Sequence, residues 1–335
     1  MGLTRKKTAT VWSGSAVVGK GLLATGLLVA LAWRGDGGQA PRTPWEFDPA
    51  TLKPFTVGEP YLGQHATGLY PGGKNDIPEA HQRAGLRVAA AIRPLGPDGQ
   101  PDDEKGRILA LVLGHSNCAM YFGAFGRHLK AHAAELHPRF ELVNAAVGGQ
   151  QLPQIRQFKG GVWDKAAKML AGPSHTPKQV QVLFLHTTWH GAGNFGMPPG
   201  PFPGTMQQME RALAEVLEHC LEAYPNLRIA YLNCDGLRHF TRFEPHVWQE
   251  AFAFKWLIEK QIKGEESTAF EAKEGRPRRL PWLQWGPYIW DNTWDRSYFV
   301  RDGVHPGEKA LDLFVRKYWD FLKADPVARP WLLKP

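Results

Sequence analysis

Asp302 and His305 lie three residues apart near the C-terminal end of the chain, just before a helical pattern. A carboxylate at this spacing can accept the Nδ1 proton of the imidazole, fix its tautomer and leave Nε2 free to take a proton from a nucleophile. The pair is therefore a candidate general base with its orienting carboxylate. Because Asp-x-x-His is common by chance, it predicts chemistry only in a chain that also supplies a nucleophile and oxyanion donors.

Ser116 is the candidate nucleophile. It follows Gly114 and His115 at the point where the apolar run 108–113 ends and a helical pattern begins. A serine at such a junction exposes its hydroxyl, and its backbone N–H joins the positive end of the helix dipole, where an oxyanion is stabilised. The alternative is that Ser116 or Asn117 simply caps the helix.

Gly149 ends a second apolar run, 140–147, together with Gly148. A glycine at this turn permits a positive φ and lets a substrate oxygen approach a backbone N–H closely. A tight turn with no chemical role is the alternative interpretation.

Short apolar runs alternate with amphipathic patterns from residue 107 onward. The runs predict strands at 108–113, 140–147, 180–185 and 227–232, and the patterns predict helices at 119–136, 206–223, 246–262 and 307–322. Such alternation predicts an α/β fold with a parallel sheet covered on both sides. In these sheets, sites lie beyond the C-terminal ends of the strands.

A serine after the first strand, a glycine after the second and Asp-x-x-His before the last helix together resemble the SGNH hydrolases, the GDSL esterase/lipase superfamily. The resemblance covers roughly residues 106–325 and implies a three-layer α/β/α sandwich with a central parallel sheet, a flavodoxin-like fold. It implies that Ser116 is the nucleophile, His305 the general base and Asp302 its orienter. It also implies that the N–H groups of Ser116 and Gly149 are oxyanion donors and that no cofactor is needed.

Two positions depart from the pattern of that family. His115 stands where the family has Asp, and the segment after the third strand lacks the family's Asn. Thr188 and Asn194 are the two candidates for the missing third oxyanion donor. Loss of such a donor costs about 3–4 kcal/mol of transition-state stabilisation.

Other residues offer competing chemistry. His186 and His190, four residues apart, are a candidate zinc pair, although ordinary polar roles at a strand end explain them as well and no metal site is predicted. Cys118 is a rival nucleophile to Ser116, but free cysteines are usually buried apolar residues. A bridge between Cys220 and Cys234 is compatible with an oxidising compartment.

The N-terminal residues 1–33 read as a targeting segment. Basic residues at 5–7 precede an apolar stretch from 21 to 33 that ends in small residues, which indicates a cleaved signal peptide or an uncleaved membrane anchor. Either one places the rest of the chain outside the cytoplasm, in the periplasm, in the medium or on a membrane. We expect a linker and irregular segment at 34–105, with a short strand around 86–92, the hydrolase-like domain at 106–325 and a tail at 326–335.

Composition excludes some partners and leaves others open. The net charge is +8, but no basic stripe interleaved with aromatic residues is present, so nucleic-acid binding is not predicted. A Gly/Pro-rich loop at 191–204 is a candidate lid beside the site. Four tryptophans, which either fill space or stack on sugars, precede the Asp-x-x-His motif: Trp282, Trp285, Trp290 and Trp294.

These features predict an exported serine hydrolase that cleaves a small-molecule or glycan ester through an acyl-enzyme. The alternative is a catalytically weak or inactive protein of the same fold that binds glycan or cell-surface material. The sequence indicates neither the acyl group nor the oligomeric state.

Overall fold

The predicted apolar runs form the strands of a parallel sheet. The computed structural model describes residues 52–189, 200–235, 245–291 and 293–334, and all of them belong to one unit, Phe47–Pro335. Neighbouring strands pair in parallel in the order β2-β1-β3-β4-β5. The strands are β1 (Ile108–Gly114), β2 (Phe140–Asn144), β3 (Val180–His186), β4 (Ile229–Asn233) and β5 (Trp282–Trp285).

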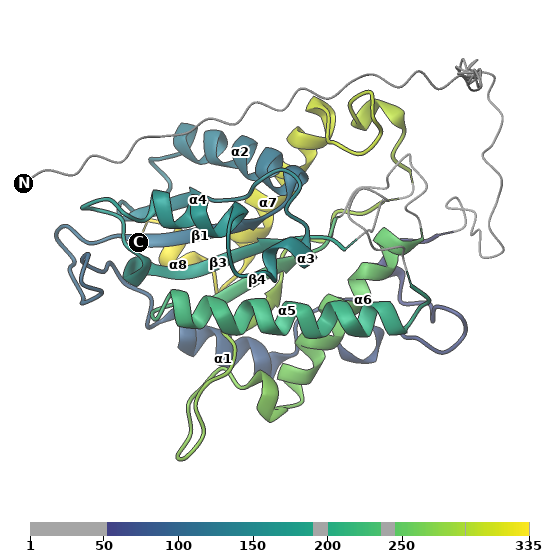
Figure 1. The fold of residues 1–335 in the computed structure, drawn as a ribbon, viewed down its shortest axis with the longest axis horizontal. Helices are drawn as coiled ribbons and strands as arrows, with labels where there is room; N and C mark the ends of the chain where they lie inside the picture. Colours follow the sequence, from purple (N-terminus) through teal and green to yellow (C-terminus); the bar gives the residue numbers. More distant parts are fainter. Residues whose placement is uncertain (1–51, 190–199, 236–244, 292, 335) are drawn as a thin grey trace, which may run out of the picture. The chain divides into compact units, whose positions relative to one another are not determined.

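Helices cover both faces of this sheet, which gives the predicted three-layer α/β/α sandwich (Figure 1). One face carries α3 (Leu152–Ile155), α4 (Gly161–Met169), α5 (Gly204–Ala223) and α6 (His246–Ile262). The other carries α1 (Glu79–Ala89), α2 (Ser116–Ala131), α7 (Glu308–Ala324) and α8 (Arg329–Leu332). Short 3₁₀ helices lie at Phe55–Val57, Pro71–Gly73, Pro177–Gln179, Glu266–Thr268 and Arg296–Tyr298.

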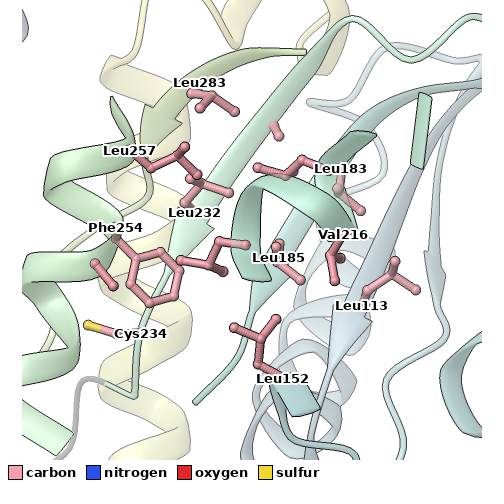
Figure 2. Packing of buried hydrophobic residues seen from close by; sticks show 14 of the residues in the cluster. Leu113, Leu152, Leu183, Leu185, Val216, Leu232, Cys234, Phe254, Leu257 and Leu283 are labelled. Atoms are coloured by element: carbon pink, nitrogen blue, oxygen red, sulfur yellow. The ribbon is translucent and has the colours of Figure 1, made fainter. Parts of the chain in front are cut away.

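Alternating residues of the strands point into two separate hydrophobic cores. All seven residues of β1 and of β3 are buried, as expected for strands covered on both faces. Figure 2 shows the core beneath α5 and α6, where Leu113, Leu185 and Leu232 of three adjacent strands face Val216 and Leu257. The sheet is therefore a rigid base, and its strands end at one common edge.

The described residues before β1, from 52 onward, pack on the sheet. Leu52, Phe55 and Tyr70 are buried in the core beneath α5 and α6. The short strand predicted around 86–92 is wrong, because helix α1 occupies residues 79–89. The buried residues of α1 recur at helical spacing, and they pack on the face of the sheet that includes the side chain of Trp282.

The C-terminal residues also belong to the core. Trp331 and Leu332 of α8 are fully buried, and Leu333 pairs with Leu136 in an isolated bridge. Strand β5 was not predicted. It contains two of the four tryptophans, and all four are buried, which supports the space-filling interpretation: Trp282, Trp285, Trp290 and Trp294.

None of the helices within the described ranges combines the length and the apolar character that a membrane span requires. The predicted targeting segment, residues 1–33, lies outside the described residues.

Candidate active site

Ser116 is presented by a sharp junction between β1 and α2. Gly114 ends the strand, and a Cβ built on it would overlap the carbonyl oxygen of His186 and the sulfur of Cys118. A side chain at this position would therefore force β1 away from β3. His115 continues in extended backbone, and Ser116 is the first residue of the helix. Ser116 thus lies at the positive end of the α2 dipole, at the C-terminal edge of the sheet.

The structure brings the three predicted catalytic residues together. Ser116 Oγ lies 2.9 Å from His305 Nε2. His305 Nδ1 in turn lies 2.7 Å from Asp302 Oδ2. Both distances are those of hydrogen bonds, so Nε2 can accept the hydroxyl proton while Nδ1–H donates to the carboxylate. The serine, imidazole and carboxylate form one continuous chain of hydrogen bonds.

A tight turn fixes Asp302 and His305. The second carboxylate oxygen of Asp302 accepts backbone N–H bonds from Val304 at 2.9 Å and from His305 at 3.0 Å. Gly303 completes the turn with a φ of +74°, a conformation that glycine adopts without a steric cost. The N–H of Val300 donates to the carbonyl of His305 at 2.9 Å and closes the loop. The carboxylate therefore organises the backbone that carries its own histidine.

The carboxylate of Asp302 stays ionised at any ordinary pH. Partial burial alone would raise its pKa, but hydrogen bonds from the His305 ring and from the backbone amides of His305 and Val304 outweigh it. They lower the pKa of Asp302 from 3.8 to about 2. The side chains of Asp302 and His305 are 47% and 36% exposed, so the pair lies at the surface, where a substrate can reach it.

Two backbone segments that carry N–H groups without intrahelical or turn acceptors lie close to Ser116, namely the turn after β2 and the start of α2. A Cβ built on Gly148 would stand 4.0 Å from the Cβ of Ser116, so the turn after β2 lies beside the nucleophile. Gly149 has a φ of +74°, and a Cβ built there would meet no atom within 4 Å beyond its chain neighbours. No described residue accepts a hydrogen bond from the Gly149 N–H. The first amides of α2 likewise lack intrahelical acceptors.

The predicted third donor has a different partner. The hydroxyl of Thr188 lies 2.8 and 2.9 Å from the two carboxylate oxygens of Glu250, a fully buried side chain that also accepts the N–H of Trp189 at 2.8 Å. A threonine hydroxyl has one proton to donate. In this conformation the proton of Thr188 points to Glu250, and the role of Thr188 as an oxyanion donor stays a prediction. Asn194, the other candidate, lies outside the described residues.

The sequence did not predict a buried carboxylate, Asp235, that lies beside the two chain neighbours of Ser116. Asp235 is 0% exposed. It lies 3.1 Å from His115 Nε2, 3.2 Å from His186 Nε2 and 3.2 Å from Asn117 Nδ2. The Asn117 amide also donates to the carbonyl of Val304 at 3.2 Å. The only sequence signal for Asp235 is its place three residues after the end of a predicted strand.

The competing chemistries find no support in these contacts. Cys118 is fully buried, and burial, followed by the charge of Asp235, raises the pKa of its thiol well above the usual value. That environment favours a buried apolar role over a thiolate nucleophile. His186 is bonded to Asp235, while its proposed zinc partner His190 lies outside the described residues. Cys220 and Cys234 are not joined by a disulfide.

The candidate lid is described only at its C-terminal end, from residue 200 onward. There the ring of Phe202 packs edge-on against Tyr61 and His65, with centroid distances of 5.1 and 4.8 Å. The role of this loop as a lid stays a prediction.

Known proteins resemble the chain in structure rather than in sequence. No family model and no curated protein matches it. Similar solved structures include TesA (14% identity, TM-score 0.40), covering 65% of this chain and 99% of TesA. They also include a protein assigned as an SGNH hydrolase from Slackia heliotrinireducens (12% identity, TM-score 0.34; 65% and 100%). A third is Bacillus subtilis YxiM (13% identity, TM-score 0.36; 67% and 58%). At these values the likeness concerns the fold, and nothing about chemistry is taken from it.

Proposed function

We propose that this chain is a serine hydrolase that cleaves an ester, either a carbohydrate O-acyl ester or another small acyl ester. The observation that carries the proposal is the hydrogen-bonded chain from Ser116 through His305 to Asp302, set at the start of a helix. This chain supports the proposal because acyl transfer needs a nucleophile bonded to a base and a carboxylate that orients the base.

The proposed reaction begins when Ser116 Oγ attacks the ester carbonyl carbon and its proton moves to His305 Nε2. The backbone N–H groups of Ser116 and Gly149 hold the resulting oxyanion. His305 then gives the proton to the departing alcohol, and the acyl group remains on Ser116. Water then gives a proton to His305 and attacks the acyl carbon, the bond from that carbon to Ser116 Oγ breaks, and His305 returns the proton to Oγ as the acid leaves. Asp302 stays ionised throughout and stabilises the imidazolium.

A second candidate is a catalytically weak protein that binds glycan or cell-surface material. The observation that favours it is the engagement of Thr188 with Glu250, which leaves the third oxyanion donor unassigned among the described residues. The buried tryptophans lend no support to stacking on sugars, because their faces are covered. We also propose, from the residues at 1–33, that the chain acts outside the cytoplasm.

Turnover of p-nitrophenyl acetate by the purified chain tests the proposal. The account predicts measurable hydrolysis that falls about 10⁴-fold or more in Ser116→Ala. The free energy of unfolding should change by less than about 0.5 kcal/mol, because the hydroxyl is only half-buried. No turnover by the intact chain of any acetyl, aryl or lipid ester, combined with glycan binding that survives Ser116→Ala, would favour the second candidate.

A further inference from the structure

We infer that Asp235 is a positioning residue that holds the Ser116 helix start against the His305 loop. Its effect on the reaction rests on the proposed function, whereas its effect on the geometry does not. Asp235 follows β4, and its carboxylate lies within hydrogen-bond distance of His115 and Asn117, the two neighbours of Ser116 in the chain, and of His186.

Three donors from different parts of the sheet edge converge on this one carboxylate. His115 comes from the end of β1, Asn117 from the first turn of α2, and His186 from the end of β3. An asparagine amide nitrogen can only donate, so the oxygens that face it accept. A carboxylate that is 0% exposed is tolerated in its ionised form only when several donors surround it.

The two imidazoles serve Asp235 as donors rather than as bases. Burial lowers the pKa of His186, although its hydrogen bond and charge interaction with Asp235 oppose the shift. A neutral ring that donates Nε2–H carries a bare Nδ1, and the Nδ1 atoms of His186 and His115 are buried with no hydrogen-bond partner among the described residues. Both rings are thus fixed in one tautomer by the same carboxylate.

Asn117 extends the cluster to the catalytic loop. Its amide nitrogen donates both to Asp235 and to the carbonyl of Val304. Asn117 follows the nucleophile in the chain, and Val304 precedes the base. A shift of about 1 Å between nucleophile and base can cost about 10²-fold in rate. Holding the two neighbours together therefore holds the Ser116–His305 distance.

The cluster also explains the histidine at position 115. An aspartate there, as in the resembled family, would place a second carboxylate against the buried Asp235 with no proton between them. His115 instead supplies a donor. In this chain the carboxylate beside His115 and Asn117 is that of Asp235, which follows β4.

The test compares Asp235→Asn with Asp325→Asn, two changes of the same kind at buried carboxylates. Asp325 is 6% exposed, accepts the Tyr231 hydroxyl at 2.7 Å and lies in the segment between α7 and α8. With p-nitrophenyl acetate, Asp235→Asn should lower kcat about 10²-fold and leave KM within about twofold. Asp325→Asn should lower the Tm but leave kcat within about threefold.

Hydrogen exchange of the peptide covering residues 300–307 gives a second readout, independent of turnover. Its exchange should rise at least fivefold in Asp235→Asn, also in a Ser116→Ala background, and stay unchanged in Asp325→Asn. Asn117→Ala removes the link to Val304 directly and should repeat both effects, which covers the case that Asp235→Asn does not fold. Equal kcat or equal exchange in Asp235→Asn and Asp325→Asn would overturn the inference. An inactive wild type with the predicted exchange pattern would overturn only the proposed function.

Discussion

Two sets of carboxylates and imidazoles flank Ser116, and they use opposite ring nitrogens. His305 donates Nδ1–H to Asp302 and offers Nε2 to the serine hydroxyl. His186 instead donates Nε2–H to Asp235, and its Nδ1 has no partner in the part of the chain that the structure describes. The first pair is 36% and 47% exposed, whereas the second is fully buried.

This difference shows that an Asp–His hydrogen bond does not by itself make a base. An imidazole acts as a base only where its second nitrogen meets a proton to take and its charged form is tolerated. In the proposed reaction His305 is that base, because its Nε2 lies 2.9 Å from the Ser116 hydroxyl and its ring lies beside the carboxylate of Asp302 at the surface. Burial opposes the charging of His186, so this ring contributes fixed geometry.

The largest effects are expected when His305 and His186 are each replaced by glutamine, which tests the difference between the two pairs. His305→Gln should lower kcat for p-nitrophenyl acetate about 10⁴-fold or more, because no group remains to take the Ser116 proton. The free energy of unfolding should change by less than about 0.5 kcal/mol. His186→Gln should show the opposite pattern, with a larger effect on stability than on kcat. Its free energy of unfolding should fall by about 1–3 kcal/mol, because the change disturbs the donors of a buried carboxylate.

Urea unfolding and steady-state kinetics on both variants supply the measurements. If His305→Gln lost more stability than His186→Gln, the division into a chemical pair and a structural pair would be wrong.

A smaller effect is expected at Gly149. Gly149→Ala meets no steric obstacle from other residues, but it places a side chain on a backbone with φ of +74°. The strain of about 1 kcal/mol should shift the turn and weaken the oxyanion contact. We expect kcat to fall about tenfold, with KM little changed. Gly264→Ala, at a φ of +77° with similarly open space, is the matched control and should lose stability alone; an equal kcat in both variants would exclude Gly149 from the oxyanion site.

The smallest effect is on the acid stability. Asp302 has a pKa of about 2 in the folded chain against 3.8 as its ordinary value, so the folded state binds its proton less readily than the unfolded state. The stabilisation is present above pH 3.8 and is lost as the pH falls towards 2. Because the side chain is 47% exposed, solvent screening keeps it below about 1 kcal/mol.

Unfolding in urea at pH 5 and pH 2.5 should therefore show a slightly smaller loss of stability in Asp302→Asn than in the wild type. A larger loss in the variant would mean that Asp302 is not held ionised by its turn.

The pair of Asp302 and His305 could be predicted from the sequence, whereas the cluster of donors around Asp235 could not. Asp302 and His305 are three residues apart, and Ser116 lies between an apolar run and a helical pattern, so local sequence reveals them. Asp235 gathers donors from three strand or helix ends. Only the order of the strands in the sheet brings those ends together, and no local pattern encodes that order.

The same reasoning separates the strands that were predicted from the one that was missed. β1 and β3 are long apolar runs buried on both faces, so their composition alone identifies them. β5 is four residues long and rich in tryptophan, which suggested filler rather than a strand. The apolar residues at 86–92 predict a strand, but residues 79–89 form helix α1, whose Gly85 lies against the ring of Trp282 from the distant strand β5.

Covalent labelling with a fluorophosphonate, mapped by mass spectrometry, tests the central claim most directly. The reagent reacts with a serine only when a base activates its hydroxyl, so it reports on the Ser116–His305 hydrogen bond itself. The account predicts one adduct on the peptide that contains Ser116, with none in Ser116→Ala and very little in His305→Gln. An unlabelled wild type, or equal labelling of wild type and Ser116→Ala, would contradict it.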